Sequence, residues 1–259
     1  MEIPLGPDEF ILLTDQTGHH FLTRLRERGE FHCHHGIIRY ESILGKPEGT
    51  RLETSLGKTM WVFRPRLQDY QIEMPRSSTI VYPKDIGMVL VWADIFPGAR
   101  VLEAGAGSGA LSLALLRAVG AEGHLTTCDI RQDMIDRAQK NVANFCGPTP
   151  NWSLRIEDVY RNIQGGPYDR VVLDLPDPAL VVEHAARVLV PGGILCSFVP
   201  NVLQVQSTVE AYRGSGAFVE IETYETQIRP WVFRGPTGRP GHAAIGHTGF
   251  LTFARRAEA

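Results

Sequence analysis

The sequence has few cysteines, no long apolar run and no large excess of charge, and each absence excludes a class of protein. The four cysteines, Cys33, Cys128, Cys146 and Cys196, lack CxxC spacing, so we expect free thiols and neither a disulfide framework nor a zinc site. No apolar stretch approaches the ~18 residues of a membrane span, and the N-terminus MEIPLGPDEF does not read as a signal peptide. We therefore expect a cytoplasmic protein without a membrane partner.

The charge balance limits how the protein can bind a polyanion. The formal net charge is -3 over 259 residues, so no basic field covers the whole surface. A nucleic-acid partner would have to be held by local basic patches. The length allows one large or two modest domains, and a hydrophobic content of 43% is ordinary for a globular protein.

The most informative stretch is RVLEAGAGSGALSLALLRAVG at 100–120. An apolar run ends in the acidic Glu103 and enters a turn containing Gly105, Gly107 and Gly109. Apolar residues then recur with helical spacing up to Val119. This order predicts a strand, a glycine turn and a helix, with the free amide groups of the helix N-terminus directed at a ligand. The stretch predicts a nucleotide-type pocket.

The glycine pattern by itself leaves the nucleotide open. Gly105, Gly107 and Ala110 also satisfy the relaxed dinucleotide fingerprint, and Asp129 follows where a ribose-binding carboxylate is expected in either case. Glu103 favours S-adenosylmethionine, because a carboxylate before the glycines suits its sulfonium and amino groups better than a pyrophosphate. We expect a methyltransferase, with a dehydrogenase as the alternative.

The chain divides by pattern near residue 75. Residues 1–75 contain short β-prone pieces separated by turns and predict a small β-rich domain. Residues 76–259 alternate strands with helices, the first of which we expect to be capped by Asp85. They close with two extended stretches joined by a loop at 229–246, which predicts an α/β Rossmann-like sheet with an antiparallel edge strand. In the first domain, strand alternation would put His32 and His34 on one face and Cys33 and His35 on the other, so we expect no metal there.

Three carboxylates end successive predicted strands of the second domain. Because ligands bind at the carboxyl ends of such strands, we expect Asp129 to meet ribose hydroxyls, and Asp158 with Val159 to meet the adenine. The alternative is that these carboxylates cap the following helices. Asp174 ends the apolar run VVLDL and precedes a turn stiffened by two prolines, so we expect it to orient an exocyclic amine of the acceptor during catalysis.

Four motifs together resemble one family. YPKD at 82–85, VLEAGAGSG at 101–109, VVLDL at 171–175 and GHTGFL at 246–251 are similar to the bacterial and archaeal TrmI family, tRNA (adenine-N1)-methyltransferases that act on position 58 of the T-loop. The resemblance covers almost the whole chain, including the histidine-rich FHCHHG at 31–36. The glycine motif alone is generic to class I methyltransferases, whereas its combination with YPKD and GHTGFL is much more specific.

The resemblance implies a homotetramer with a Rossmann-like catalytic domain that transfers a methyl group from S-adenosylmethionine to N1 of adenine. It places the cofactor turn at Gly105, Ser108, Gly109, Ala110 and Leu111. It also implies that Asp129 binds the ribose, Asp158 lies near the adenine and Asp174 is catalytic, and that Tyr82 is an aromatic beside the target base.

Two departures from the family concern the site. The ribose-binding position is often Glu in the family and is Asp129 here, and the LPDP at 175–178 replaces a segment in which an aromatic follows the proline. For tRNA, we expect phosphate contacts from basic residues near the pocket and in two other segments, namely Arg24, Arg26, Arg28, Arg76, Lys84, Arg229, Arg234 and Arg239. The rival interpretations are a methyltransferase for another acceptor, such as protein carboxylates, and a non-catalytic RNA-binding subunit.

Overall fold

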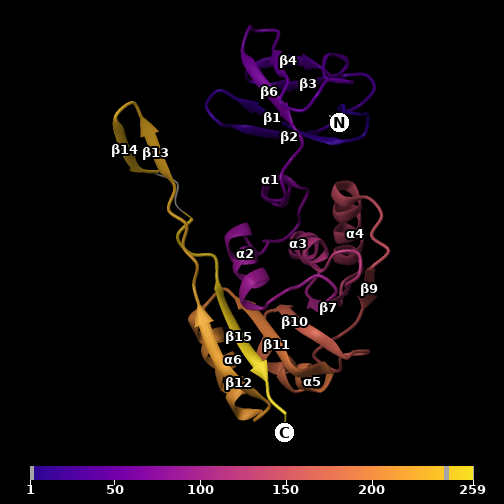
Figure 1. The fold of residues 1–259 in the computed structure, drawn as a ribbon, viewed down its shortest axis with the longest axis vertical. Coiled ribbons are helices and arrows are strands. Elements are labelled where there is room, and N and C mark those ends of the chain that lie inside the picture. The colour runs from indigo at the N-terminus through magenta and orange to yellow at the C-terminus, as the bar shows by residue number, and fades with distance from the viewer. Residues whose placement is uncertain (1–2, 242–244, 259) are drawn as a thin grey trace. The chain divides into compact units, whose positions relative to one another are not determined.

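The structure is a computed structural model that describes residues 3–241 and 245–258. The chain forms two compact units (Figure 1). The first comprises Met1–Pro75 together with Ala143–Gly147, and the second comprises Arg76–Val142 and Pro148–Ala259. Each unit has its own sheet and its own hydrophobic core.

The first unit contains a four-stranded antiparallel sheet in the order β2-β1-β6-β5. Its strands are β1 (Phe10–Asp15), β2 (His20–Arg24), β5 (Arg51–Glu53) and β6 (Thr59–Phe63). Along β6 the residues alternate between buried and partly buried, as expected for a sheet with one face on a core. Ile11, Leu13, Met60 and Val62 are fully buried in that core. A helix, α1 (Leu67–Glu73), follows the sheet.

A separate hairpin in this unit carries the histidine-rich segment. It pairs β3 (Glu30–Cys33) with β4 (Gly36–Arg39), and a short 3-10 helix, η1 (Tyr40–Ser42), follows. Because β3 ends at Cys33, His34 and His35 lie in the turn and not in a strand. The prediction that strand alternation would separate the side chains of His34 and His35 was therefore wrong.

The second unit is organised around a seven-stranded sheet in the order β12-β15-β11-β10-β7-β8-β9. Its strands are β7 (Arg100–Ala104), β8 (His124–Asp129), β9 (Trp152–Ile156), β10 (Tyr168–Asp174), β11 (Leu189–Val199), β12 (Phe218–Tyr224) and β15 (Phe250–Arg256). β7, β8, β9, β10 and β11 pair in parallel. The interior of β10 is buried, as its apolar run predicts for a central strand.

The strand order locates the ligand-binding edge. The chain proceeds outward from β7 to β9 and then returns to the other side of β7 at β10, so the direction of winding reverses between β7 and β10. Open α/β sheets bind ligands at such a switch point. β15 pairs antiparallel with both β11 and β12, so it lies inside the sheet and β12 forms the edge. This refines the prediction of an antiparallel edge strand and departs from the dinucleotide-binding order.

The helices of the second unit pack in two groups. One contains α2 (Pro83–Trp92) and α3 (Ala110–Val119), and the other contains η2 (Pro178–Val181), α5 (Val182–Val188) and α6 (Val202–Gly214). α4 (Gln132–Cys146) is amphipathic, with Met134, Ile135, Ala138 and Val142 buried. No helix in the described ranges is long and apolar enough to cross a membrane.

A second hairpin interrupts the segment that the sequence predicted to be a loop. It pairs β13 (Trp231–Arg234) with β14 (Thr237–Pro240) through a two-residue turn at Gly235 and Pro236. Gly235 has φ +56°, a conformation that glycine adopts without strain. The hairpin forms its own two-stranded sheet (Figure 1).

Candidate active site

A cavity of about 400 Å³ opens where β7, β8, β9 and β10 end. Most of its lining residues directly follow the carboxyl ends of these strands, and two others precede α2. The lining consists of Ser78, Thr79, Gly105, Gly107, Cys128, Asp129, Ile130, Arg131, Met134, Glu157, Val159, Tyr160, Asp174, Leu175 and Pro176. The cavity therefore lies at the switch point of the sheet.

The glycine turn after β7 passes close to the end of β10. Gly105 has φ +96°, and a Cβ built on it would lie 2.2 Å from the carbonyl oxygen of Asp174. No side chain fits there, so glycine is required for the two strand ends to approach. Gly109, at the start of α3, has little space around it for another reason. A Cβ built on it would lie 3.1 Å from Cα of Ala138 in α4.

The remaining residues of the predicted cofactor turn lie behind the cavity surface. Gly105 and Gly107 line the cavity, whereas Ser108, Ala110 and Leu111 are buried and absent from its lining. Asn141 of α4 donates a hydrogen bond to the Ser108 carbonyl oxygen (2.9 Å). The structure thus gives this end of the turn a packing role.

Asp129 connects the glycine turn to the end of β8. Its Oδ2 accepts a hydrogen bond from the Ala106 amide (3.0 Å), and its Oδ1 accepts one from the Arg131 amide (2.9 Å). Each carboxylate oxygen has a second acceptor position. Asp129 lines the cavity, so it can hold the turn in place and still accept hydrogen bonds from a ligand.

Asp174 is a cavity-lining carboxyl group in an unfavourable electrostatic environment. Burial, together with the charge of Asp129, raises its pKa to about 7. The turn that follows is held at two points. Tyr160 Oη accepts a hydrogen bond from the Asp177 amide (3.2 Å), and Gln204 donates one to the Pro176 carbonyl oxygen (2.7 Å). The carboxyl group of Asp174 thus stands at a fixed strand end.

The sequence predicted that Glu103 would contact the cofactor, but the side chain does not line the cavity. It is fully buried beneath the turn, where its Oε2 accepts hydrogen bonds from Ser112 (2.6 Å) and Thr127 (2.7 Å). Burial raises its pKa to about 8, although those hydrogen bonds lower it, and the charges of Asp174 and Asp129 add to the rise. Glu103 therefore lies beneath the turn as a buried carboxyl group that links α3 and β8 through its hydrogen bonds.

Asp158 also differs from its predicted role. β9 ends at Ile156, and the residues in the lining are its neighbours Glu157 and Val159. Asp158 Oδ1 accepts a hydrogen bond from the Tyr160 amide (3.1 Å), and Oδ2 lies 3.2 Å from Nε of Arg161. Asp158 is thus absent from the cavity lining, and its carboxylate stabilises the turn after β9 and not a helix end.

The YPKD motif forms the start of α2 and a buried polar network. Tyr82 is the residue before the helix, is only partly buried and lies outside the cavity lining. Asp85, predicted to cap this helix, is instead fully buried in its first turn. Lys84 is also buried, and its Nζ donates to Asp85 Oδ1 (2.7 Å) and to the Thr226 carbonyl oxygen (2.8 Å). The Lys84 ammonium group is therefore buried in this network and cannot make the phosphate contact that the sequence predicted.

The same network fixes both ends of the segment that carries β13 and β14. The hydroxyl groups of Thr226 and Thr248 donate to the two oxygens of Asp85. His247 contacts Glu225 through Nδ1 (2.6 Å) and the Pro200 carbonyl oxygen through Nε2 (2.8 Å). The YPKD and GHTGFL motifs thus meet in one hydrogen-bonded cluster.

Most of the other predicted phosphate contacts are exposed. Exposed side chains belong to Arg24, Arg26, Arg28, Arg76, Arg229 and Arg239. Arg24 also pairs with Asp8 (3.3 Å). The side chain of Arg234 lies outside the described part of the chain.

Several lining residues were missed by sequence reasoning. Ser78 and Thr79 come from the segment before α2, which has no strand or helix pattern to mark it. Ile130 had a signal, because an apolar residue that follows a ribose-binding carboxylate is placed to cover a base; its side chain is 62% exposed at the cavity. Tyr160 has no such signal, and only the structure shows its contact with the turn after β10.

Comparison with known families identifies two matching regions. Residues 58–238 match the family described as the tRNA methyltransferase complex GCD14 subunit, and residues 4–51 match the TrmI-like N-terminal family. A tRNA (adenine(58)-N(1))-methyltransferase TrmI from Thermus thermophilus is 36% identical over 254 residues, which cover 95% of this chain and 96% of that protein. A TrmI from Methanocaldococcus jannaschii named for adenines 57 and 58 is 33% identical, with 94% of each chain covered.

A solved structure matches the fold closely. The S-adenosylmethionine-dependent O-methyltransferase from Thermotoga maritima superposes with a TM-score of 0.94 at 29% identity, covering 98% of this chain and 95% of that one. The inserted antiparallel strand, the glycine turn and the cluster of carboxyl groups at the switch point define a class I S-adenosylmethionine-dependent methyltransferase. Within that class, the chain belongs to the TrmI family of tRNA (adenine(58)-N(1))-methyltransferases.

Proposed function

We propose that this protein transfers a methyl group from S-adenosylmethionine to N1 of adenine 58 in the T-loop of tRNA. The observation that carries the proposal is the carboxyl group of Asp174, held at the switch point beside the glycine turn in a chain related to TrmI over nearly its whole length. The charge of Asp129 raises the pKa of Asp174, and the charges of Asp129 and Asp174 both add to the raised pKa of Glu103. A bound cation relieves that repulsion.

The residues of the cavity divide between the two substrates. S-adenosylmethionine supplies an electrophilic methyl group on a positively charged sulfur. We assign Gly105 and Gly107 to the close backbone approach, Asp129 to the ribose hydroxyls, and Ile130 with Val159 to the two faces of the adenine ring. Asp158 is left with a structural role in this assignment.

We assign catalysis to Asp174. Adenine N1 has a free lone pair, so the reaction requires alignment more than deprotonation before attack. Ionised Asp174 would accept a hydrogen bond from the N6 amino group, turn N1 toward the methyl group and stabilise the positive charge that develops on the ring. Tyr82, at the start of α2, would stack against or enclose the target base after it leaves the T-loop.

We assign tRNA phosphate contacts to the exposed arginines. Arg24 and Arg26 belong to the first unit, whereas Arg76, Arg229 and Arg239 belong to the second. With a net charge of -3, a single chain offers little general attraction for RNA. We therefore propose a homotetramer, which would repeat these local patches, and a cytoplasmic location, where its substrate is found.

The apolar surface of the β13–β14 hairpin supports this proposed assembly. Trp231, Val232 and Phe233 are all exposed, and Phe233 has 74% of its surface accessible. Contiguous exposed apolar residues mark interaction surfaces in soluble proteins. Multi-angle light scattering of the wild type and of a Phe233→Ser variant tests this role, because a hairpin that contributes to assembly should shift the variant toward smaller species.

The proposed activity is tested by nucleoside mapping. An unmodified tRNA transcript is incubated with the enzyme and labelled S-adenosylmethionine, digested, and analysed by mass spectrometry. We expect 1-methyladenosine at position 58, and a matched transcript with guanosine at 58 should lose that product. The same digest shows whether position 57 is modified. Label that appears elsewhere, or only on protein, would exclude the proposed substrate.

The Thermotoga relative favours one rival, because its name describes an O-methyltransferase. Transfer to a protein carboxylate would produce a base-labile methyl ester, which mild alkali releases as volatile labelled methanol, whereas a methyl group on a ring nitrogen of adenine is not released as methanol. The second rival, a non-catalytic RNA-binding subunit, predicts no binding of S-adenosylmethionine. Isothermal calorimetry with the cofactor alone tests that possibility independently of the acceptor.

A further inference from the structure

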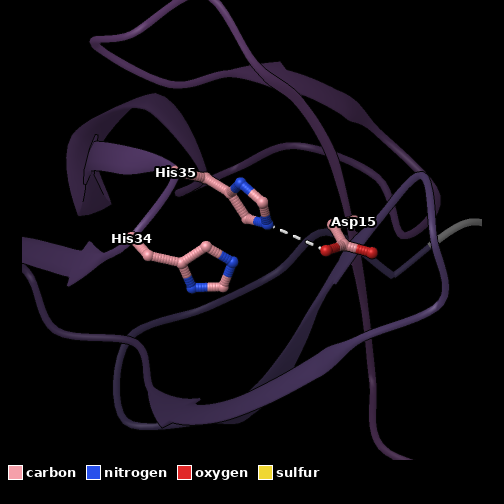
Figure 2. A group of neighbouring side chains, drawn as sticks. All are labelled: Asp15, His34 and His35. Atoms are coloured by element: carbon pink, nitrogen blue, oxygen red, sulfur yellow. Dashed lines mark hydrogen bonds and ion pairs between the residues drawn. The ribbon is translucent and has the colours of Figure 1, made fainter.

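A cluster in the first unit brings together three metal-ligating side chains. Asp15 stands at the end of β1, and His34 and His35 lie in the turn between β3 and β4 (Figure 2). One ligand atom from each residue lies within 4.8 Å of the others. His35 Nε2 is 2.8 Å from Asp15 Oδ2, and the two imidazole rings have centroids 3.8 Å apart.

The carboxylate is held in position before any ligand arrives. Its Oδ1 accepts hydrogen bonds from the Thr17 amide (2.7 Å), the Thr17 hydroxyl (2.7 Å) and the His19 amide (2.9 Å). These contacts fix the plane of the group and leave Oδ2 to face His35, with Nδ1 of the exposed His19 at 3.5 Å. Burial raises the pKa of Asp15, but hydrogen bonds from the Thr17 side chain, the His19 amide and His35 outweigh it and hold the pKa below its usual range.

Burial and exposure within the cluster are also suited to binding an ion. The Asp15 side chain is 5% exposed and that of His35 is 22% exposed, whereas His34 lies at the surface. Zinc bonds of about 2.1 Å separate neighbouring ligand atoms of a tetrahedron by about 3.4 Å. The cluster therefore has to contract slightly, which requires the exposed His34 ring to shift against the rings of His35 and Phe21.

We propose that Asp15, His34 and His35 form a binding site for a borderline divalent transition metal of the Zn²⁺ type. Two imidazole nitrogens with one carboxylate oxygen suit such ions better than Mg²⁺ or Ca²⁺, which prefer oxygen ligands. Three protein ligands leave a fourth tetrahedral position for water. The ion would join the turn after β1 to the β3–β4 hairpin, two segments that are distant in sequence.

Metal binding at this site has a defined proton balance. Because the ionised carboxylate of Asp15 can only accept, His35 Nε2 carries the hydrogen between these two atoms. If Nε2 becomes the ligand, a neutral imidazole moves that hydrogen to Nδ1, whereas an imidazolium keeps its hydrogen on Nδ1 and releases the one on Nε2 to solvent. The metal exchanges its own bound water for the three protein ligands, so no oxidant or reductant is needed.

The test uses the full-length protein stripped of metal with a chelator. We expect calorimetry with ZnCl₂ to show one saturable site and the melting temperature to rise with added Zn²⁺. His34→Ala and His35→Ala should each weaken Zn²⁺ binding at least ~10-fold. Loss of a residue that only hydrogen-bonds to a metal ligand already weakens metal affinity by about that factor. His32→Ala is the matched control, because His32 is 66% exposed, lies two residues away and is outside the cluster.

Several results would overturn the proposal. The absence of a saturable site in the wild type, or equal weakening by His32→Ala and His34→Ala, would contradict it. So would loss of binding in Cys33→Ser with no loss in His34→Ala, because the neighbouring thiol would then be the ligand. If a histidine variant fails to fold, the Zn²⁺ titration is made with Asp15→Asn, which should also weaken binding. Its amide oxygen can still accept the hydrogen bonds made at Oδ1, while the negative charge is lost.

Discussion

The raised pKa of Asp174 predicts how the rate of methyl transfer depends on pH. Asp174 must be ionised to accept from the adenine amino group and to stabilise its positive charge, and burial with the charge of Asp129 raises its pKa to about 7. A group with that pKa is about 10% ionised at pH 6 and about 90% ionised at pH 8. The value of kcat/KM for S-adenosylmethionine should therefore rise roughly tenfold across this range and bend near pH 7.

The assay measures initial rates on an unmodified tRNA transcript in buffers of constant ionic strength. Because bound S-adenosylmethionine places a cation near the carboxylate, the bend in kcat should lie at lower pH than the bend in kcat/KM. Asp174→Asn keeps the shape of the side chain but not its charge, so it should retain little activity and a flat profile. A wild-type profile that is flat between pH 6 and 8, or that survives in Asp174→Asn, would refute this reasoning.

Two further predictions concern the turn above and the carboxyl group below the cavity. Gly105→Ala should lower the free energy of unfolding by about 2–4 kcal/mol and prevent cofactor binding, because its Cβ meets the Asp174 carbonyl oxygen. Gly147→Ala, also at positive φ but in open space, should cost only about 1 kcal/mol in urea denaturation. Equal losses would show that backbone conformation and not the clash is responsible. Burial raises the pKa of Glu103 from 4.5 to about 8, so the folded state retains a proton that the unfolded state releases, and stability falls as pH rises through that window. Glu103→Gln removes this dependence, and calorimetry should show its melting temperature gaining on that of the wild type from pH 5 to pH 9; a constant difference would contradict the shift.

Local patterns predicted the centre of the catalytic unit well. The apolar run before the glycines became β7, the helical spacing after them became α3, and VVLDL became the buried end of β10 with Asp174 at the cavity. These elements succeed because their hydrophobic periodicity and their tertiary burial agree. Parallel strands also bring their carboxyl ends to one edge, so Asp129 and Asp174 were placed correctly from strand order alone.

Roles that depend on side-chain direction were harder to predict. Glu103 and Lys84 are charged residues that normally favour the surface, and nothing local shows that Ser112 and Thr127, or Asp85 and Thr226, will satisfy them in the interior. Whether Asp158 or its neighbour Glu157 lines the cavity depends on where β9 ends, and strand ends are set by tertiary pairing.

Turns caused the remaining errors. His34 and His35 were read as strand residues, yet the chain reverses directly after Cys33, and Gly36 at φ +110° completes that reversal. The β13–β14 hairpin was predicted to be a loop because its strands are short and glycine and proline occur throughout β14 and the turn before it, although Gly235 is a recognisable signal for a two-residue turn.

Two hydrogen bonds to Asp85 anchor the segment that contains the β13–β14 hairpin. Thr226 and Thr248 bring the two ends of that segment to a single carboxylate, so the chain between them forms a closed loop anchored at its base. The entropic cost of closing such a loop grows only slowly with its length. Substitutions and insertions at the tip therefore act mainly on the surface presented to other macromolecules. A lineage can vary that surface while the cofactor cavity and the sheet beneath it stay unchanged.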